Sequence, residues 1–159
     1  LDQDNDCGYH FYNDNKALAD SMSKVIGYNF RISNAEFLTI TDSKNTTNTL
    51  NITVKNTGVA PCFFDIYMVA EFVDSSGNAL EQLGETVAIK KGTFKDEMVK
   101  EISFTSTIPA RLSNVVQMPG VFVALSIYES EEAFKVGKNP TVRFDNDGIL
   151  ENKKLLLKE

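Results

Sequence analysis

Apolar residues recur at every second position along much of this chain, a period that is typical of β-strands with one buried face. Leu50, Ile52 and Val54 alternate with polar residues, which predicts a half-buried antiparallel strand. The segment 63–73 is apolar at both parities, apart from two acidic residues. Such a strand lies inside a sandwich, or a second layer covers its outer face.

The same reading predicts roughly nine short strands, joined by polar turns and without a sustained helical period. The other strands are expected over 8–12, 26–32, 35–41, 80–89, 98–104, 121–128, 141–144 and 149–158. Polar loops are expected over 42–48 and 107–113, the second with a short helical turn. Turns are expected at 74–77 and at 145–148, where Asp-Asn-Asp-Gly is a strong hairpin signal. We therefore predict an all-β fold, an immunoglobulin-like antiparallel β-sandwich of roughly eight to nine strands.

Asn56, Gly58 and Pro61 separate the strand at 50–55 from the long apolar strand that follows. Glycine tolerates a positive φ, which we expect at Gly58. Proline has no N–H to give to a ladder, so Pro61 is expected at a strand start or on an edge. We interpret this stretch as a structural corner and not as a ligand-binding loop.

The chain has 159 residues, the size of one domain. No repeat, linker or low-complexity tract divides it. We expect a β-sandwich domain over 26–159 and an N-terminal segment, 1–25, that carries a short strand and packs on the domain. The start at Leu1, without Met, basic residues or an apolar leader, indicates a processed or truncated chain. The missing signal peptide therefore says nothing about where the protein resides.

The formal net charge is −6, and no cluster of basic residues interrupts the acidic balance. Lys90-Lys91 and Lys153-Lys154 are isolated pairs, which we expect at the surface. Nucleic acids and anionic membranes are therefore poor partners for this chain. No apolar run approaches the length of a membrane span, so membrane insertion is not expected.

Residues suited to catalysis or to metal binding are few. His10 is the single histidine, and no Cys-His pair stands at ligand spacing. No nucleophile elbow, phosphate-binding loop or dinucleotide-binding glycine motif occurs. We expect no enzyme activity of the isolated domain, no catalytic residue, no metal and no cofactor.

Acidic residues gather in two places that resemble calcium loops. Asp2, Asp4 and Asp6 alternate, but Cys7 stands where such a loop needs glycine, so a flexible acidic lead-in is expected. Asp145 and Asp147 lie in the predicted hairpin, which needs no ion.

Asp65 and Glu71 lie on one face of the long apolar strand. Their six-residue separation places them on the order of 20 Å apart, too far for a glycosidase acid–base pair. We interpret them as charges on an exposed or edge face, where they oppose unwanted strand pairing.

Cys7 and Cys62 are the two cysteines. A disulfide between them would tie the N-terminal segment to the central strand. Two free thiols, used as small apolar residues, are the other reading, and the sequence leaves both open.

The chain has no Trp, and its Tyr and Phe residues fall mostly at inward positions. Tyr9, Tyr12, Phe63 and Tyr67 are the aromatic residues from which a surface platform for sugars would be built. We assign none of them to a site, and the ligand-binding residues remain unknown.

Several short motifs together resemble a known family. These are Leu50-x-Ile-x-Val-x-Asn-Thr-Gly-Val-Ala-Pro61, the apolar strand that ends in Asp-Ser-Ser-Gly77, Gly27-Tyr-Asn-Phe-Arg-Ile32, Pro119-Gly120 and Asn139-Pro-Thr-Val142. Over most of 26–157 the chain resembles the C-terminal β-sandwich accessory domain of bacterial, Bacteroidetes-like, glycoside-hydrolase-like proteins of uncharacterised family. Cys62-Phe63 stands where that family has an aromatic residue.

The resemblance implies a secreted, periplasmic or cell-surface setting and a non-catalytic accessory domain of a carbohydrate-active protein. Such a domain packs on a catalytic or other adjacent domain, or assists the binding of polysaccharide. The parent protein can then be a glycoside hydrolase, although the family has no catalytic residues in this domain. The alternative is an immunoglobulin-like module for cell-surface adhesion or protein interaction, since similar motifs recur in such modules.

Overall fold

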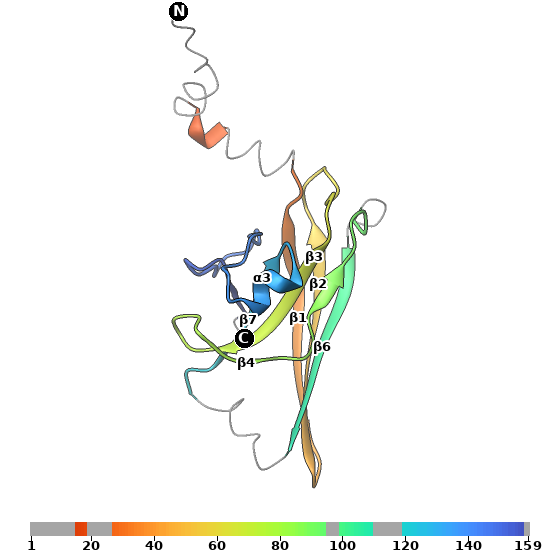
Figure 1. Cartoon of the computed structure of the whole chain (residues 1–159), viewed down its shortest axis with the longest axis vertical. Coiled ribbons are helices and arrows are strands. Elements are labelled where there is room, and N and C mark those ends of the chain that lie inside the picture. Colours follow the sequence, from red (N-terminus) through yellow and green to blue (C-terminus); the bar gives the residue numbers. More distant parts are fainter. Residues whose placement is uncertain (1–14, 19–26, 95–98, 110–118, 158–159) are drawn as a thin grey trace, which may run out of the picture.

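The computed structural model describes residues 15–18, 27–94, 99–109 and 119–157. The fold is all-β, and its strands form two antiparallel sheets (Figure 1). The first sheet has the order β1-β2-β6, from β1 (Phe30–Thr41), β2 (Asn45–Asn56) and β6 (Val99–Pro109). The second has the order β4-β3-β7-β8, from β4 (Ala79–Gln82), β3 (Ile66–Val73), β7 (Phe122–Tyr128) and β8 (Leu155–Leu157). The short β5 (Val87–Ile89) also pairs with β3.

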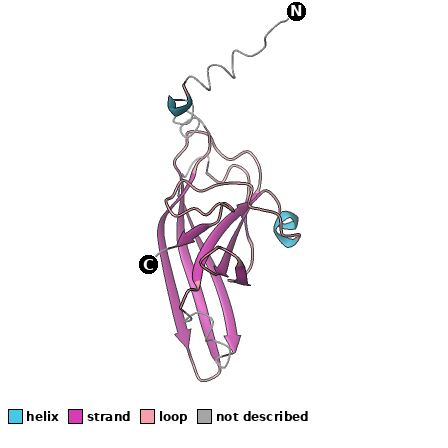
Figure 2. Ribbon diagram, turned by 90° about the vertical axis from the view of Figure 1, so that its left-hand side faces the viewer, coloured by secondary structure: helices cyan, strands magenta, loops and turns pink. Residues whose placement is uncertain are grey.

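The two sheets pack face to face, and alternate residues of their strands fill the space between them. The first sheet contributes Phe30, Ile32, Leu50, Ile52, Val54, Ile102 and Phe104. The second contributes Ile66, Met68, Ala70, Phe72, Leu125, Ile127 and Leu155. The strands of the first sheet extend beyond the second at the end away from the start of β1 (Figures 1 and 2).

The outer face of the second sheet is covered by a short helix, α3 (Glu131–Lys135). Val69, Tyr128 and Ala133 form a second buried cluster there, with Tyr67 and Phe134 packed against it. The prediction for the apolar strand is therefore confirmed, since both faces of β3 are covered. Ser130 begins the helix by accepting a hydrogen bond from the Ala133 N–H, a capping signal that the sequence reading missed.

The first sheet is longer than predicted. Residues 26–32 and 35–41 were expected as two strands, but β1 is continuous, and a β-bulge between Ile32 and Asn34 absorbs the interruption. The prediction of a loop over 42–48 is wrong beyond Lys44, because the Thr and Asn residues of 45–49 belong to β2. Residues 105–109 likewise continue β6, where Thr105 and Thr107 lie opposite Thr49 and Thr47.

The predicted strand 80–89 is divided into β4 and β5 around Gly84. Gly84 has a positive φ of 72°, and a Cβ there would lie 2.7 Å from the backbone nitrogen of Thr105. Only glycine fits this crossing, where the chain passes the free edge of β6.

The turn at 74–77 is confirmed, with the Asp74 carboxylate accepting hydrogen bonds from the N–H groups of Ser76 and Asn78.

The prediction of a hairpin at 145–148 is wrong. The chain reverses later, where Lys153 N–H donates to the Leu150 carbonyl and Lys153 has a φ of 64°. The segment 145–148 instead joins the two sheets, because Asn146 finds its partners on β1. Residues 141–144 form only isolated bridges, Phe144 to Phe30 and Val142 to Ile127.

The predicted N-terminal segment, 1–25, lies almost wholly outside the described residues, so its strand and its packing stay predictions. Within the described residues, no helix has the length and apolar character needed to cross a membrane.

Candidate functional site

The corner between β2 and β3 is held by the side chain of Asn56, which is buried. Its Oδ1 accepts hydrogen bonds from the N–H of Asn29 at 2.8 Å and of Gly58 at 3.1 Å. Its Nδ2 donates to the Ala60 carbonyl at 2.8 Å. One amide therefore satisfies three backbone groups, which fixes the corner against the start of β1.

Gly58 is needed in this corner for a reason other than the predicted one. It is not among the residues with positive φ. A Cβ on Gly58 would instead lie 1.9 Å from the carbonyl oxygen of Gly27, so close approach of two backbone segments excludes any side chain.

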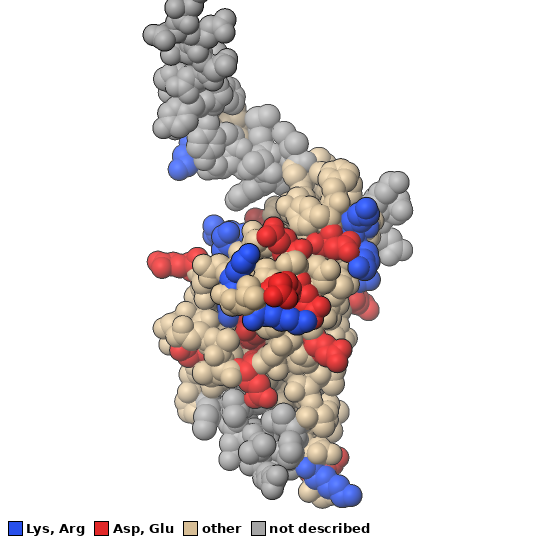
Figure 3. Space-filling model, in the orientation of Figure 1, with Lys and Arg blue, Asp and Glu red and all other residues tan. Residues whose placement is uncertain are grey.

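Apolar side chains lie exposed on this corner and on the segment beside it. Phe63 is 73% exposed and Val59 is 69% exposed, while Phe64 packs edge-on against Tyr28 with ring centroids 5.4 Å apart. We call Tyr28, Val59, Phe63 and Phe64 the corner patch. The space-filling view shows a largely uncharged surface at this upper end of the domain, above a belt of charged side chains (Figure 3).

Cys62 lies buried beneath the corner patch and donates a weak hydrogen bond from its thiol to the Phe64 carbonyl. Burial raises the pKa of this thiol above its ordinary value. Cys7 lies outside the described residues, so the alternatives of a disulfide or two free thiols stay open. Within the described part of the chain, Cys62 forms no disulfide.

Stability is expected to fall as the pH rises above about 9. Burial raises the pKa of Cys62 above its ordinary 9.0, and that of Tyr28 and Tyr128 above 10.0. The unfolded chain releases these protons at the ordinary values while the folded chain keeps them, so alkaline conditions favour unfolding. Urea midpoints at about pH 8 and about pH 10.5 test this, and equal midpoints would contradict it.

Asp65 lies next to the corner, just before β3, and pairs with Lys90 at 2.8 Å. Its other carboxylate oxygen accepts a hydrogen bond from the Lys91 N–H. The Lys90 side chain, followed by the Lys91 N–H, lowers the pKa of Asp65. This exposed pair anchors the β5 end and matches the prediction of a charge at the surface.

The prediction of a charge on an exposed or edge face is wrong for Glu71, the second acidic residue. It is buried on the outer face of central strand β3, where its Oε2 lies 2.7 Å from the Nζ of Lys154. Lys154 was expected at the surface and is also buried. The strand is not an edge, and the segment before β8 brings the lysine that neutralises the carboxylate.

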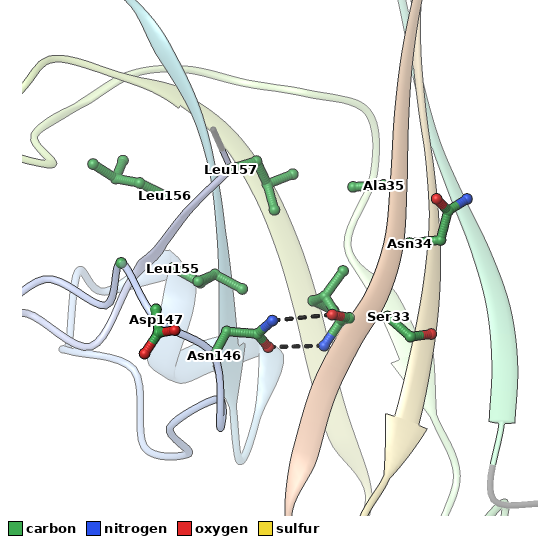
Figure 4. Close-up of a pocket in the computed structure, with 10 residues that line it drawn as sticks. Ser33, Asn34, Ala35, Asn146, Asp147, Leu155, Leu156 and Leu157 are labelled. Carbon is green, nitrogen blue, oxygen red and sulfur yellow. Dashed lines mark hydrogen bonds between the residues drawn. The ribbon is translucent and has the colours of Figure 1, made fainter. Parts of the chain in front are cut away.

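A groove with a volume of 370 Å³ lies between the edge of β1 and the edge of β8 (Figure 4). Asn146 closes one end of it, accepting from the Ile32 N–H at 2.8 Å and donating to the Ile32 carbonyl at 3.0 Å. Leu155, Leu157 and Ala35 point into the space between the sheets, and Leu156 points away. Asp147 is the one charged residue in the lining, so the groove offers apolar surface and strand edge, not acid–base chemistry.

The residues considered for chemistry are dispersed. Phe63 is exposed as a platform would require, whereas Tyr67 is half-buried under α3. No group of three metal-ligating side chains occurs in the residues that the structure describes, Asp145 and Asp147 included. His10, Tyr9, Tyr12 and the acidic lead-in of Asp2, Asp4 and Asp6 lie outside those residues.

Neither the corner patch nor the groove was found from the sequence as a site. Phe63 was singled out by its aromatic type, and Val59 gave no signal beyond its place beside a turn. Comparison with protein-family models and with curated proteins gives no match for this sequence.

Proposed function

We propose that this chain is a non-catalytic immunoglobulin-like β-sandwich, an accessory domain that docks through its corner patch on an adjacent domain of a secreted or periplasmic carbohydrate-active protein. The strand order supports the immunoglobulin-like assignment. Three strands, β1-β2-β6, face β4-β3-β7-β8, and the chain crosses between the sheets after β2, β5 and β6.

The single observation that carries the docking proposal is the exposure of Val59, Phe63 and Phe64 on one rigid corner. Exposing phenylalanine side chains to water costs free energy, and a group of them on a fixed backbone marks an interaction surface. The corner also contacts Gly27, the point where the chain enters the domain from its N-terminal side. A domain that precedes this point would lie next to the patch.

The carbohydrate setting rests on the resemblance of the corner and strand motifs. Phe63 is the exposed aromatic that a sugar could stack on, but the groove between β1 and β8 does not include it. The corner patch is therefore better suited to docking on a protein domain than to binding a sugar. A glycan array on the isolated domain tests the second use, and hydrolysis of a chromogenic glycoside would overturn the proposal of a non-catalytic domain.

Replacing both Phe63 and Val59 with serine is expected to uncouple the domain from its neighbour. In the protein that carries both domains, we expect one cooperative thermal transition for the wild type and two transitions, or an earlier one, for the variant. Leu80→Ser, at an exposed position on β4, is the control and leaves the coupling unchanged. Coupling that survives the double substitution contradicts the proposal, as does a protein with no neighbouring domain.

A further inference from the structure

The edge of β1 is a long outer edge of the first sheet. β1 pairs with β2 on one side only. On its other side, Phe30 bridges Phe144, and Asn146 forms hydrogen bonds with Ile32. From Asn34 to Thr41, no described residue pairs with the backbone on this side. The other outer strands are β6, with 11 residues, and β4 and β8, with four and three. The free edge of β6 carries Lys100, Glu101 and Pro109, and the segment at Gly84 passes it beside Thr105.

Between Asn34 and Thr41 this edge has little of the usual protection against pairing. Natural edges are shielded by charges, proline or short length. Between Asn34 and Thr41, Glu36 is the single charged residue, and no proline occurs. Leu38 and Ile40 are 43% and 69% exposed on the outer face. The edge is therefore suited to accept another strand.

We propose that β1 pairs antiparallel with β1 of a second copy of this chain, about a two-fold axis at Leu38, and joins two three-stranded sheets into one. Asn146 shows which backbone groups are available, because it bonds the Ile32 N–H and carbonyl on the free side. After the one-residue bulge, the backbone N–H and carbonyl groups of alternate residues point to this free side, away from β2. These residues are Ala35, Phe37, Thr39 and Thr41.

The axis at Leu38 matches these groups residue by residue. Phe37 then lies opposite Thr39 of the second copy, and Ala35 lies opposite its Thr41, so that open groups meet open groups. These pairs supply about eight backbone hydrogen bonds. On the outer face, Leu38 meets Leu38 of the second copy, which covers an apolar side chain that is now in water.

The charged side chains also favour a second copy of this chain as the partner, in the register with the axis at Leu38. Glu36 faces Ile40 of the second copy, so no like charges meet across the axis. Lys44 lies in the exposed turn that follows β1, at the end of the joined edge where β1 of the second copy begins and its Asp147 lines the groove. Neither Lys44 nor Asp147 has an ion-pair partner among the described residues, so the dimer would pair them twice.

The test is the oligomeric state of the isolated chain by sedimentation equilibrium across a concentration series. We expect a monomer–dimer equilibrium that Leu38→Lys weakens by about tenfold or more, because it places two ammonium groups on the axis. Ile40→Lys is the matched control, since this lysine meets Glu36 of the second copy, and the dimer persists. A wild type that stays monomeric throughout, or a dimer unaffected by Leu38→Lys, overturns the proposal.

A second readout is independent of charge. In a chain with Cys7→Ser and Cys62→Ser, checked for native folding by its unfolding transition, Leu38→Cys is expected to form an intermolecular disulfide under mild oxidation. Ile40→Cys is expected to form none, because its counterpart is Glu36. Equal cross-linking of both variants overturns the register. These tests do not involve the corner patch, so the docking proposal stands or fails separately.

Discussion

Glu71→Ala is expected to destabilise the domain by about 3–5 kcal/mol, because it leaves the Lys154 ammonium buried without its partner. The two side chains lie 2.7 Å apart on the covered face of β3, where little water reaches either of them. Their attraction compensates the cost of removing both charges from water, and it does so only while both are present. Urea unfolding monitored by fluorescence or circular dichroism measures the loss.

Two variants separate this explanation from a simple loss of packing. Replacing Glu71 and Lys154 together with methionine removes both charges and is expected to restore most of the stability. Glu131→Ala breaks the exposed pair with Lys135 on α3 and is expected to change stability by less than about 0.5 kcal/mol. A double variant as unstable as Glu71→Ala would contradict the buried-charge explanation.

Asn56→Ala is expected to cost on the order of 3 kcal/mol, since it leaves three backbone groups of the corner without their partner. The N–H groups of Asn29 and Gly58 and the Ala60 carbonyl all lose a hydrogen bond to one amide. The same unfolding measurement checks this value. In the variant, the chain near the exposed Phe63 is also expected to become susceptible to proteolysis.

Asn51→Ala is the matched control, because Asn51 lies on the same strand but bonds only the exposed Ser103 hydroxyl. It is expected to change stability by less than about 1 kcal/mol. A cost for Asn56→Ala no larger than that of the control would show that water replaces the amide, and the corner would not be a rigid element.

The sequence predicted the strands whose side chains form long apolar patterns. β3 and β7 were recognised because their apolar runs are bounded by turn residues. The ends of β2 and β6 were missed, because the Thr and Asn residues that form them are as common in loops as on the wet face of a sheet. Pairing with a neighbouring strand decided between these readings, and a single segment does not show its neighbour.

The buried pair and the open edge depend on contacts between distant parts of the chain. Glu71 and Lys154 are 83 residues apart, and each resembles a surface residue in its own segment. Asn146 was read as a turn residue because its Asp-Asn-Asp-Gly context favours a hairpin. The corner was interpreted correctly as structural, although the role of Gly58 depends on Gly27, which only the fold brings into contact.

The hydrogen bond between Ile32 and Asn146 is expected to form late in folding, since it joins residues 114 positions apart. β1 and β2 are connected by a tight turn, and such local contacts form early, whereas contacts of large sequence separation form late. Ile32 therefore gains its edge partner only after almost the whole domain has been synthesised. Until then the whole outer edge of β1 is open in a nascent chain, and neighbouring ribosomes on one message would bring two such edges together.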